Sequence, residues 1–165
     1  GVVSVRRRAE KPSRAARKLF LAAQKASEAG DRETAIARLR EALTLQPAFA
    51  EAHSNLGTQY ARMGRVAEAL VEFEEARRLD DSSPVIWANC AAMYLDLKRL
   101  GDAELALREA LRRDPAYAPT HFLLGNLAVQ RRDFREAERQ LAMAAERMPS
   151  AALALERLRK LAVAR

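Results

Sequence analysis

The chain has 165 residues, of which 49% are hydrophobic and 5% are aromatic. The 35 alanines favour closely packed helices over β-sheet layers, so we expect an all-α protein with a buried core. No apolar run approaches the roughly 18 residues of a transmembrane helix, so we expect a soluble chain. Its compartment stays open: cytoplasmic, periplasmic or secreted. A single cysteine excludes an intrachain disulfide.

The net charge of +7 is concentrated at the start of the chain, where residues 1–18 carry +6. We expect residues 1–13 to form a basic leader or linker. The basic residues of this leader and of the start of the first predicted helix are Arg6, Arg7, Arg8, Lys11 and Arg14. Several interpretations stay open: a solvated linker, the end of an upstream domain, the end of a membrane anchor, or a basic tail that binds acidic surfaces.

Helix signals follow one another along the chain. Pro12 and Ser13 open the first predicted helix, Ser83 before Pro84 is a second N-cap signal, and residues 133–136 form a capping box. Between them, apolar residues recur at spacings of three and four over segments of about a dozen residues, which is typical of amphipathic helices. The expected turns between paired helices contain Gly30, Gly64 and Gly101.

The sequence repeats itself with a period of 34 residues. The period aligns small residues in three rows and apolar residues in a fourth, and it needs no insertion or deletion. The rows are Ala23, Gly57, Ala91 and Gly125; Ala35, Ala69, Ala103 and Ala137; Ala42, Ala76, Ala110 and Ala144; and Leu39, Phe73, Leu107 and Leu141. The predicted repeats are residues 16–49, 50–83, 84–117 and 118–151.

The second and third repeats carry a recognisable pattern of large, small and aromatic residues. The second has His53, Leu56, Gly57, Tyr60, Ala69 and Phe73; the third has Trp87, Cys90, Ala91, Tyr94, Ala103, Leu107 and Pro115. This array resembles the tetratricopeptide repeat family, with Cys90-Ala91 in place of Leu-Gly as a departure. The resemblance implies a right-handed α-solenoid of four helix-turn-helix repeats, followed by a capping helix at residues 152–165.

Gly57 marks a place where two helices must approach closely. A glycine inside a helix costs about 1 kcal/mol relative to alanine, so packing has to offset that cost. We therefore expect the rows of glycine and alanine to be the helix crossings. In the last segment Arg159 occupies the Gly57 position, which is too large for a crossing and fits a solvated cap.

No catalytic or metal site is predicted. His53 and His121 share a packing position two repeats apart, and Cys90 shares the position of Leu56 and Leu124, so all three are expected to pack. There is no phosphate-binding loop and no nucleophile motif. We expect a protein that is not an enzyme and needs no cofactor.

The family resemblance implies that the first helix of each repeat lines a groove that binds a peptide. The strongest candidates are Phe20, Gln24, Asn55, Thr58, Arg62, Asn89, Leu95, Phe122 and Asn126. The other expected groove residues are Arg17, Ser27, Glu28, Glu51, Ser54, Val85, Ala88, Ala92, Asp96, Pro119, Leu123, Val129 and Gln130. An asparagine amide both donates and accepts, which suits the main chain of an extended peptide; hydrogen bonding within the array is the alternative for Asn55 and Asn89. The groove is close to neutral, so nucleic acid is not its expected ligand.

The predicted function is a protein-interaction scaffold whose groove binds a peptide or helical segment of a partner. A clamp for chaperone C-terminal carboxylates is not expected, because the required basic positions hold Phe20 and Val85, or Ser54, Pro119 and Leu123. Three alternatives stay open. They are electrostatic binding of nucleic acid or anionic membrane through the basic leader, service as the recognition domain of a larger enzyme, and self-association through the ends of the array.

Overall fold

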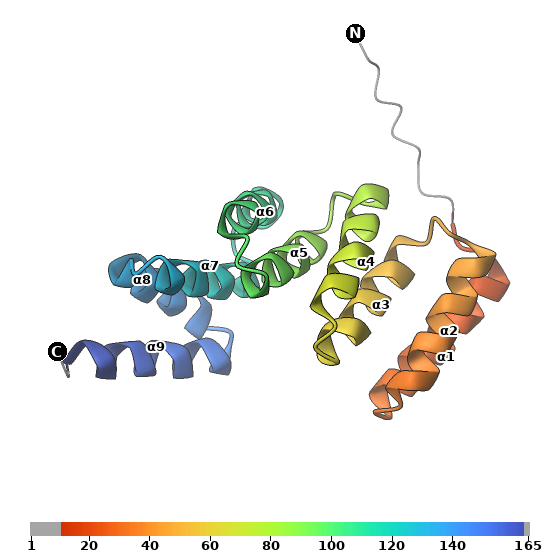
Figure 1. Cartoon of the computed structure of the whole chain (residues 1–165), viewed down its shortest axis with the longest axis horizontal. Coiled ribbons are helices and arrows are strands. Elements are labelled where there is room, and N and C mark those ends of the chain that lie inside the picture. Colours follow the sequence, from red (N-terminus) through yellow and green to blue (C-terminus); the bar gives the residue numbers. More distant parts are fainter. Residues whose placement is uncertain (1–10, 164–165) are drawn as a thin grey trace, which may run out of the picture. The chain divides into compact units, whose positions relative to one another are not determined.

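A computed structural model describes residues 11–163, and all the regular structure in that range is helical (Figure 1). The helices are α1 (Arg14–Glu28), α2 (Arg32–Leu45), α3 (Ala50–Arg62), α4 (Val66–Leu79), α5 (Pro84–Asp96), α6 (Leu100–Arg113), α7 (Ala118–Gln130), α8 (Phe134–Ala145) and α9 (Pro149–Val163). The prediction of an all-α helical repeat is confirmed, since α3, α5 and α7 begin one 34-residue period apart. Arg6, Arg7 and Arg8 lie outside the described residues.

The chain divides into two compact units, residues 1–81 with α1–α4 and residues 82–165 with α5–α9. In the first unit α1 packs on α2 and α3 on α4, and α2 also contacts α3. In the second unit α5 pairs with α6 and α7 with α8, while α6 and α5 both contact α7. The last helix, α9, packs on α8, as expected of a capping helix, and begins three residues before the predicted boundary.

Two of the three predicted N-cap side chains form a capping hydrogen bond. The Ser13 hydroxyl and the Asp133 carboxylate each accept a hydrogen bond from the backbone N–H three residues on, at 3.2 and 3.1 Å. Ser83 is the N-cap residue of α5 and Pro84 is its first residue, as predicted, although the Ser83 side chain makes no capping hydrogen bond. Proline at the first helical position already removes one of the N–H groups that a cap would satisfy.

Each turn between paired helices has one residue with positive φ. These residues are Gly30 (φ 80°), Gly64 (72°), Lys98 (59°) and Arg132 (62°), one period apart. The predicted place of Gly101 in a turn is wrong, because Gly101 lies in the first turn of α6. The left-handed conformation costs a residue with a side chain about 1–2 kcal/mol, and the later repeats tolerate this cost at Lys98 and Arg132.

The repeated rows form the core of both units. The eight alanines of the two alanine rows, Ala35, Ala69, Ala103, Ala137, Ala42, Ala76, Ala110 and Ala144, are each 0% exposed. Gly57 lies where α3 crosses α4, and a methyl group there would come within 2.9 Å of the Phe73 ring and 3.1 Å of the Ala69 carbonyl oxygen. At Gly125 a methyl group would lie 2.7 Å from Leu141. The small residues are therefore required by backbone-to-side-chain contact.

The surface of the described part of the chain has many ion pairs within single helices. Most join residues three or four apart, as in Arg38–Glu41 and Arg139–Glu136. Hydrogen bonds from Arg112 and Arg113 lower the pKa of Glu109 to about 2. These contacts fit the expected solvated helix faces, whose exposed pairs stabilise a fold only weakly. Within residues 11–163, none of the helices has the length and apolar character needed to cross a membrane.

Candidate functional site

The first unit has a polar pocket of about 170 Å³ between its first helices, α1 and α3. This is where the family resemblance located a groove. The pocket brings together four of the strongest candidates, Gln24, Asn55, Thr58 and Arg62. The remaining lining residues are Ala23, Ser27, Glu28, Leu39 and Gln59.

Gln59 is the lining residue of this pocket that sequence reasoning missed. It is 4% exposed, and its side-chain N–H donates to the Ser27 hydroxyl at 2.9 Å. Its carbonyl oxygen Oε1 is buried without a hydrogen-bond partner in the structure. The equivalent positions one period earlier and one and two periods later are Lys25, Met93 and Leu127. This row mixes charged and apolar residues, so the repeat pattern gave no signal for Gln59.

The asparagine amides of the grooves have no internal partner. Asn55, Asn89 and Asn126 are all partly exposed, and none forms a side-chain hydrogen bond with another residue in the described part of the chain. The neighbouring Thr58 differs, because its hydroxyl donates to the Ser54 carbonyl oxygen at 3.0 Å. The amides are therefore free to donate to and accept from a ligand.

The second unit has a more apolar pocket of about 280 Å³ between α5 and α7. Of the strongest candidates it contains Leu95 and Asn126, and its other lining residues are Ala92, Asp96, Leu123, Val129 and Gln130. Leu95 is only 4% exposed, so it forms the floor of the pocket. Asn89 and Phe122 are partly exposed on the same two helices and do not line this pocket.

Phe20 lies in the core of the first unit. It is 4% exposed, and its ring centroid lies 5.0 Å from that of Phe49 at an interplanar angle of 39°. The Arg17 guanidinium lies over the Phe20 ring, 5.3 Å from its centroid. Of the leader residues, Lys11 and Arg14 are described and both are exposed.

A further pocket, of about 570 Å³, lies against the capping helix in the second unit. Its lining residues are Ala145, Ala152, Leu155, Glu156, Arg159 and Lys160. Arg159 donates to Glu138 on α8 at 2.7 Å. The exposed Arg159 thus pairs with the neighbouring helix, in agreement with the expected solvated cap. Self-association through this end stays a prediction.

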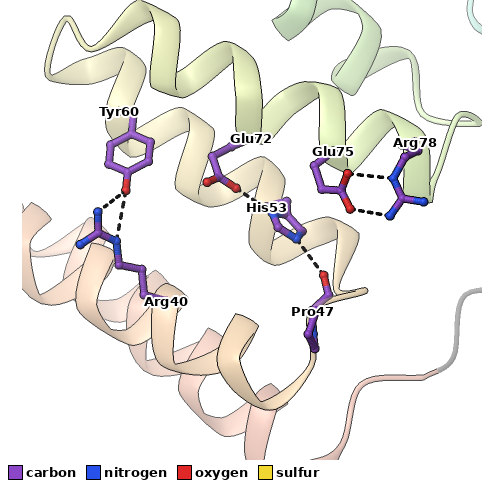
Figure 2. A network of polar contacts seen from close by, with 7 residues as sticks. All are labelled: Arg40, Pro47, His53, Tyr60, Glu72, Glu75 and Arg78. Atoms are coloured by element: carbon purple, nitrogen blue, oxygen red, sulfur yellow. Dashed lines mark hydrogen bonds and ion pairs between the residues drawn. The ribbon is translucent and has the colours of Figure 1, made fainter.

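The two histidines make the same pair of contacts in their respective repeats. His53 contacts Glu72 through Nδ1 at 2.6 Å and the Pro47 carbonyl through Nε2 at 2.8 Å (Figure 2). His121 contacts Gln140 and the Pro115 carbonyl at 2.7 and 2.8 Å. Each ring thus ties the turn before its helix to the following second helix, which agrees with the expected packing role.

The surroundings of His53 raise the pKa of its imidazole. Burial alone would lower that pKa, but the hydrogen bonds to Glu72 and the Pro47 carbonyl and the negative charges of Glu72 and Glu75 outweigh burial. Figure 2 shows the ring between these groups, with Glu75 held separately by Arg78. The same view shows Arg40 donating to the Tyr60 hydroxyl, which links α2 to α3.

We expect the first unit to lose stability as the pH rises through the pKa of folded His53. Because that pKa is raised, the imidazolium stabilises the fold fully below the unfolded value of about 6.5 and stops doing so above the folded value. Thermal unfolding of the intact chain from about pH 6 to about pH 8 should show this loss, and His53→Gln should remove it. Identical pH profiles of the two chains would contradict the assignment.

Within the described residues no cluster of three or more histidine, cysteine or acidic side chains is placed to hold a metal ion. Cys90 is 1% exposed and belongs to the buried face of α5. Such a thiol behaves as a small apolar group. Each unit has one pocket between the first helices of its two repeats.

The 34-residue repeat of paired helices defines the chain as a helical-repeat protein. Three family models match the chain: one described as TPR repeat over residues 28–64, and two described as Tetratricopeptide repeat over residues 50–83 and 85–117. The chain belongs to the tetratricopeptide repeat family. That membership supports a general role as a scaffold for protein–protein interaction.

The chain is similar to one relative in sequence and to two solved structures in fold. The cytochrome c-type biogenesis protein CycH of Pseudomonas aeruginosa is 31% identical over 73% of this chain, which spans only 30% of CycH. TTC0263, a thermophilic TPR protein of Thermus thermophilus, has a TM-score of 0.77 at 23% identity, covering 87% of this chain and 81% of its own. MamA of Desulfovibrio magneticus has a TM-score of 0.76 at 18% identity, with 90% and 85% covered. At such identities the two structures show the shared fold alone.

Proposed function

We propose that the chain binds an extended or helical segment of a partner protein through the exposed face of the first helices of its repeats, on which Asn55 and Asn89 lie. The proposal rests on the unpaired side-chain amides of Asn55 and Asn89. They lie one period apart, are partly exposed, and make no side-chain hydrogen bond with another described residue. A peptide main chain presents N–H and C=O groups together, and a carboxamide can satisfy both.

The charges of the pockets favour a protein ligand over a nucleic acid. The pocket of the first unit contains one carboxylate and one guanidinium, Glu28 and Arg62. That of the second unit contains one carboxylate, Asp96. Binding to a phosphate backbone requires an excess of basic side chains, which neither pocket offers.

Binding rather than catalysis fits the side chains that could otherwise react. Both imidazoles are engaged through both ring nitrogens, and the Cys90 thiol is buried in a helix interface. The relative CycH is a cytochrome c-type biogenesis protein. Proteins of that process are therefore reasonable first partners to test.

The experiment compares capture of a partner from nuclease-treated lysate of the native host by the intact chain and by Asn55→Ala/Asn89→Ala. A matched control, Val71→Ala/Leu105→Ala, changes one exposed residue on a second helix of each unit. The asparagine variant should bind its partner roughly tenfold more weakly per lost amide, because each amide contributes about one hydrogen bond or more. The control should bind as the intact chain does.

Two results would contradict the proposal. If the partner is still captured after both amides are lost, the partner does not bind at the first helices. Capture that is lost between about 150 and about 500 mM salt, and is insensitive to the asparagine variant, would transfer the function to the basic leader.

A further inference from the structure

The pockets of the two units occupy equivalent positions in the repeat but have different walls. Six of the nine residues of the first pocket have a counterpart two periods later in the second pocket. The pairs are Gln24 and Ala92, Ser27 and Leu95, Glu28 and Asp96, Asn55 and Leu123, Thr58 and Asn126, and Arg62 and Gln130. Three polar wall residues of the first unit are therefore replaced by aliphatic ones in the second.

The carboxylate is retained in both pockets, whereas the cation is not. In the first unit Glu28 shares its pocket with Arg62. In the second unit Asp96 shares its pocket with Gln130, a neutral amide. The second pocket thus has a negative charge without the positive charge that accompanies it in the first.

Asp96 is exposed and has no partner within the described chain, neither by hydrogen bond nor by ion pair. The cations near it in the sequence or on α7 are occupied elsewhere. Lys98 donates to Gln130 at 3.2 Å, Arg99 to Asp102 at 2.8 Å and Arg131 to Glu104 at 2.6 Å. The Asp96 carboxylate therefore forms no ion pair within the described residues, and the Lys98 ammonium at this pocket bonds Gln130 instead.

The position of Asp96 is also locally unfavourable. It is the last residue of α5, where the negative end of the helix dipole repels a carboxylate. The equivalent last residue of α3 is Arg62, which the dipole favours. A residue that is unfavourable for its helix and has no internal partner is one that a ligand can make favourable.

The geometry points to a pocket in the second unit that accepts a lysine or arginine side chain of the bound peptide. The aliphatic stem of such a side chain would lie on Leu95, Leu123 and Val129, and its charged end would bond the Asp96 carboxylate. Asn126 and Gln130 can accept further hydrogen bonds from that end. This inference rests on the proposed peptide binding and adds the class of side chain that the second unit selects.

The test uses the full chain and a displayed library of random 12-residue peptides, selected in parallel on the intact chain and on Asp96→Asn. Peptides from the intact chain should contain a fixed lysine or arginine. Replacing it with methionine, which keeps the apolar stem, should weaken binding to the intact chain roughly tenfold and leave binding to Asp96→Asn nearly unchanged. A control, Glu146→Gln, removes an exposed carboxylate outside the pockets and should preserve the tenfold difference.

A charge reversal separates recognition from a structural effect. Asp96→Lys should bind the glutamate analogue of a selected peptide more tightly than the basic parent, while its helical content stays unchanged. Peptides that bind through Asn55 and Asn89 with no basic preference, or with a preference that survives Asp96→Asn, would overturn this inference alone. If the folded intact chain selects no peptide, the proposed function falls, and this inference falls with it.

Discussion

Gly57→Leu should lower the free energy of unfolding of the first unit by about 3 kcal/mol. A methyl group alone at this position would lie 2.9 Å from two ring carbons of Phe73 and 3.1 Å from the Ala69 carbonyl oxygen. Phe73 is 2% exposed and cannot turn away, and the carbonyl oxygen belongs to the backbone of α4. Leucine would therefore force α3 and α4 apart along their crossing.

Denaturant unfolding followed by circular dichroism measures this loss. The matched control is Ala67→Leu, an exposed position on α4 in the same unit, which should change stability by no more than about 0.5 kcal/mol. Equal effects of the two leucines would show that α3 and α4 do not meet at Gly57.

Phe20→Ala should lower the free energy of unfolding by about 4 kcal/mol, because it removes a large ring from the core. The Phe20 ring is 4% exposed and packs on Phe49, which is 2% exposed. Part of the loss comes from the aromatic pair itself. The same unfolding measurement checks this value.

Leu21→Ala is the control for that change, one residue along α1 and 51% exposed, and it should alter stability by about 0.5 kcal/mol at most. A Phe20→Ala chain of unchanged stability that binds its partner poorly would instead make Phe20 a ligand contact. The pair of variants therefore separates the core from the groove on one helix.

The helical repeat could be predicted because packing imposes a constraint at the same places in every repeat. A crossing excludes side chains larger than a methyl group, so the rows of Gly57, Ala35 and Ala42 appear directly in the sequence. Turns impose a weaker constraint. The left-handed conformation tolerates Lys98 and Arg132, and a search for glycine therefore misplaced the third turn at Gly101.

The candidate site was harder to predict than the fold. The family pattern predicted the helices on which it lies, and three of the predicted residues, Asn55, Thr58 and Arg62, line one pocket. It gave no indication of which side chains fill the space between helices, so the burial of Phe20 and the participation of Gln59 emerge only from the packed structure. Whether an amide has a partner depends on contacts between repeats, which a periodic pattern does not contain.

The central claim is that a partner protein binds on the first helices of the repeats. A photoreactive amino acid placed at Arg62 or Gln130, exposed residues that line the two pockets, should crosslink to the captured partner. The same group at Val71 or Leu105, exposed residues of α4 and α6, should not. Crosslinks from Val71 or Leu105 without crosslinks from Arg62 or Gln130 would contradict the account.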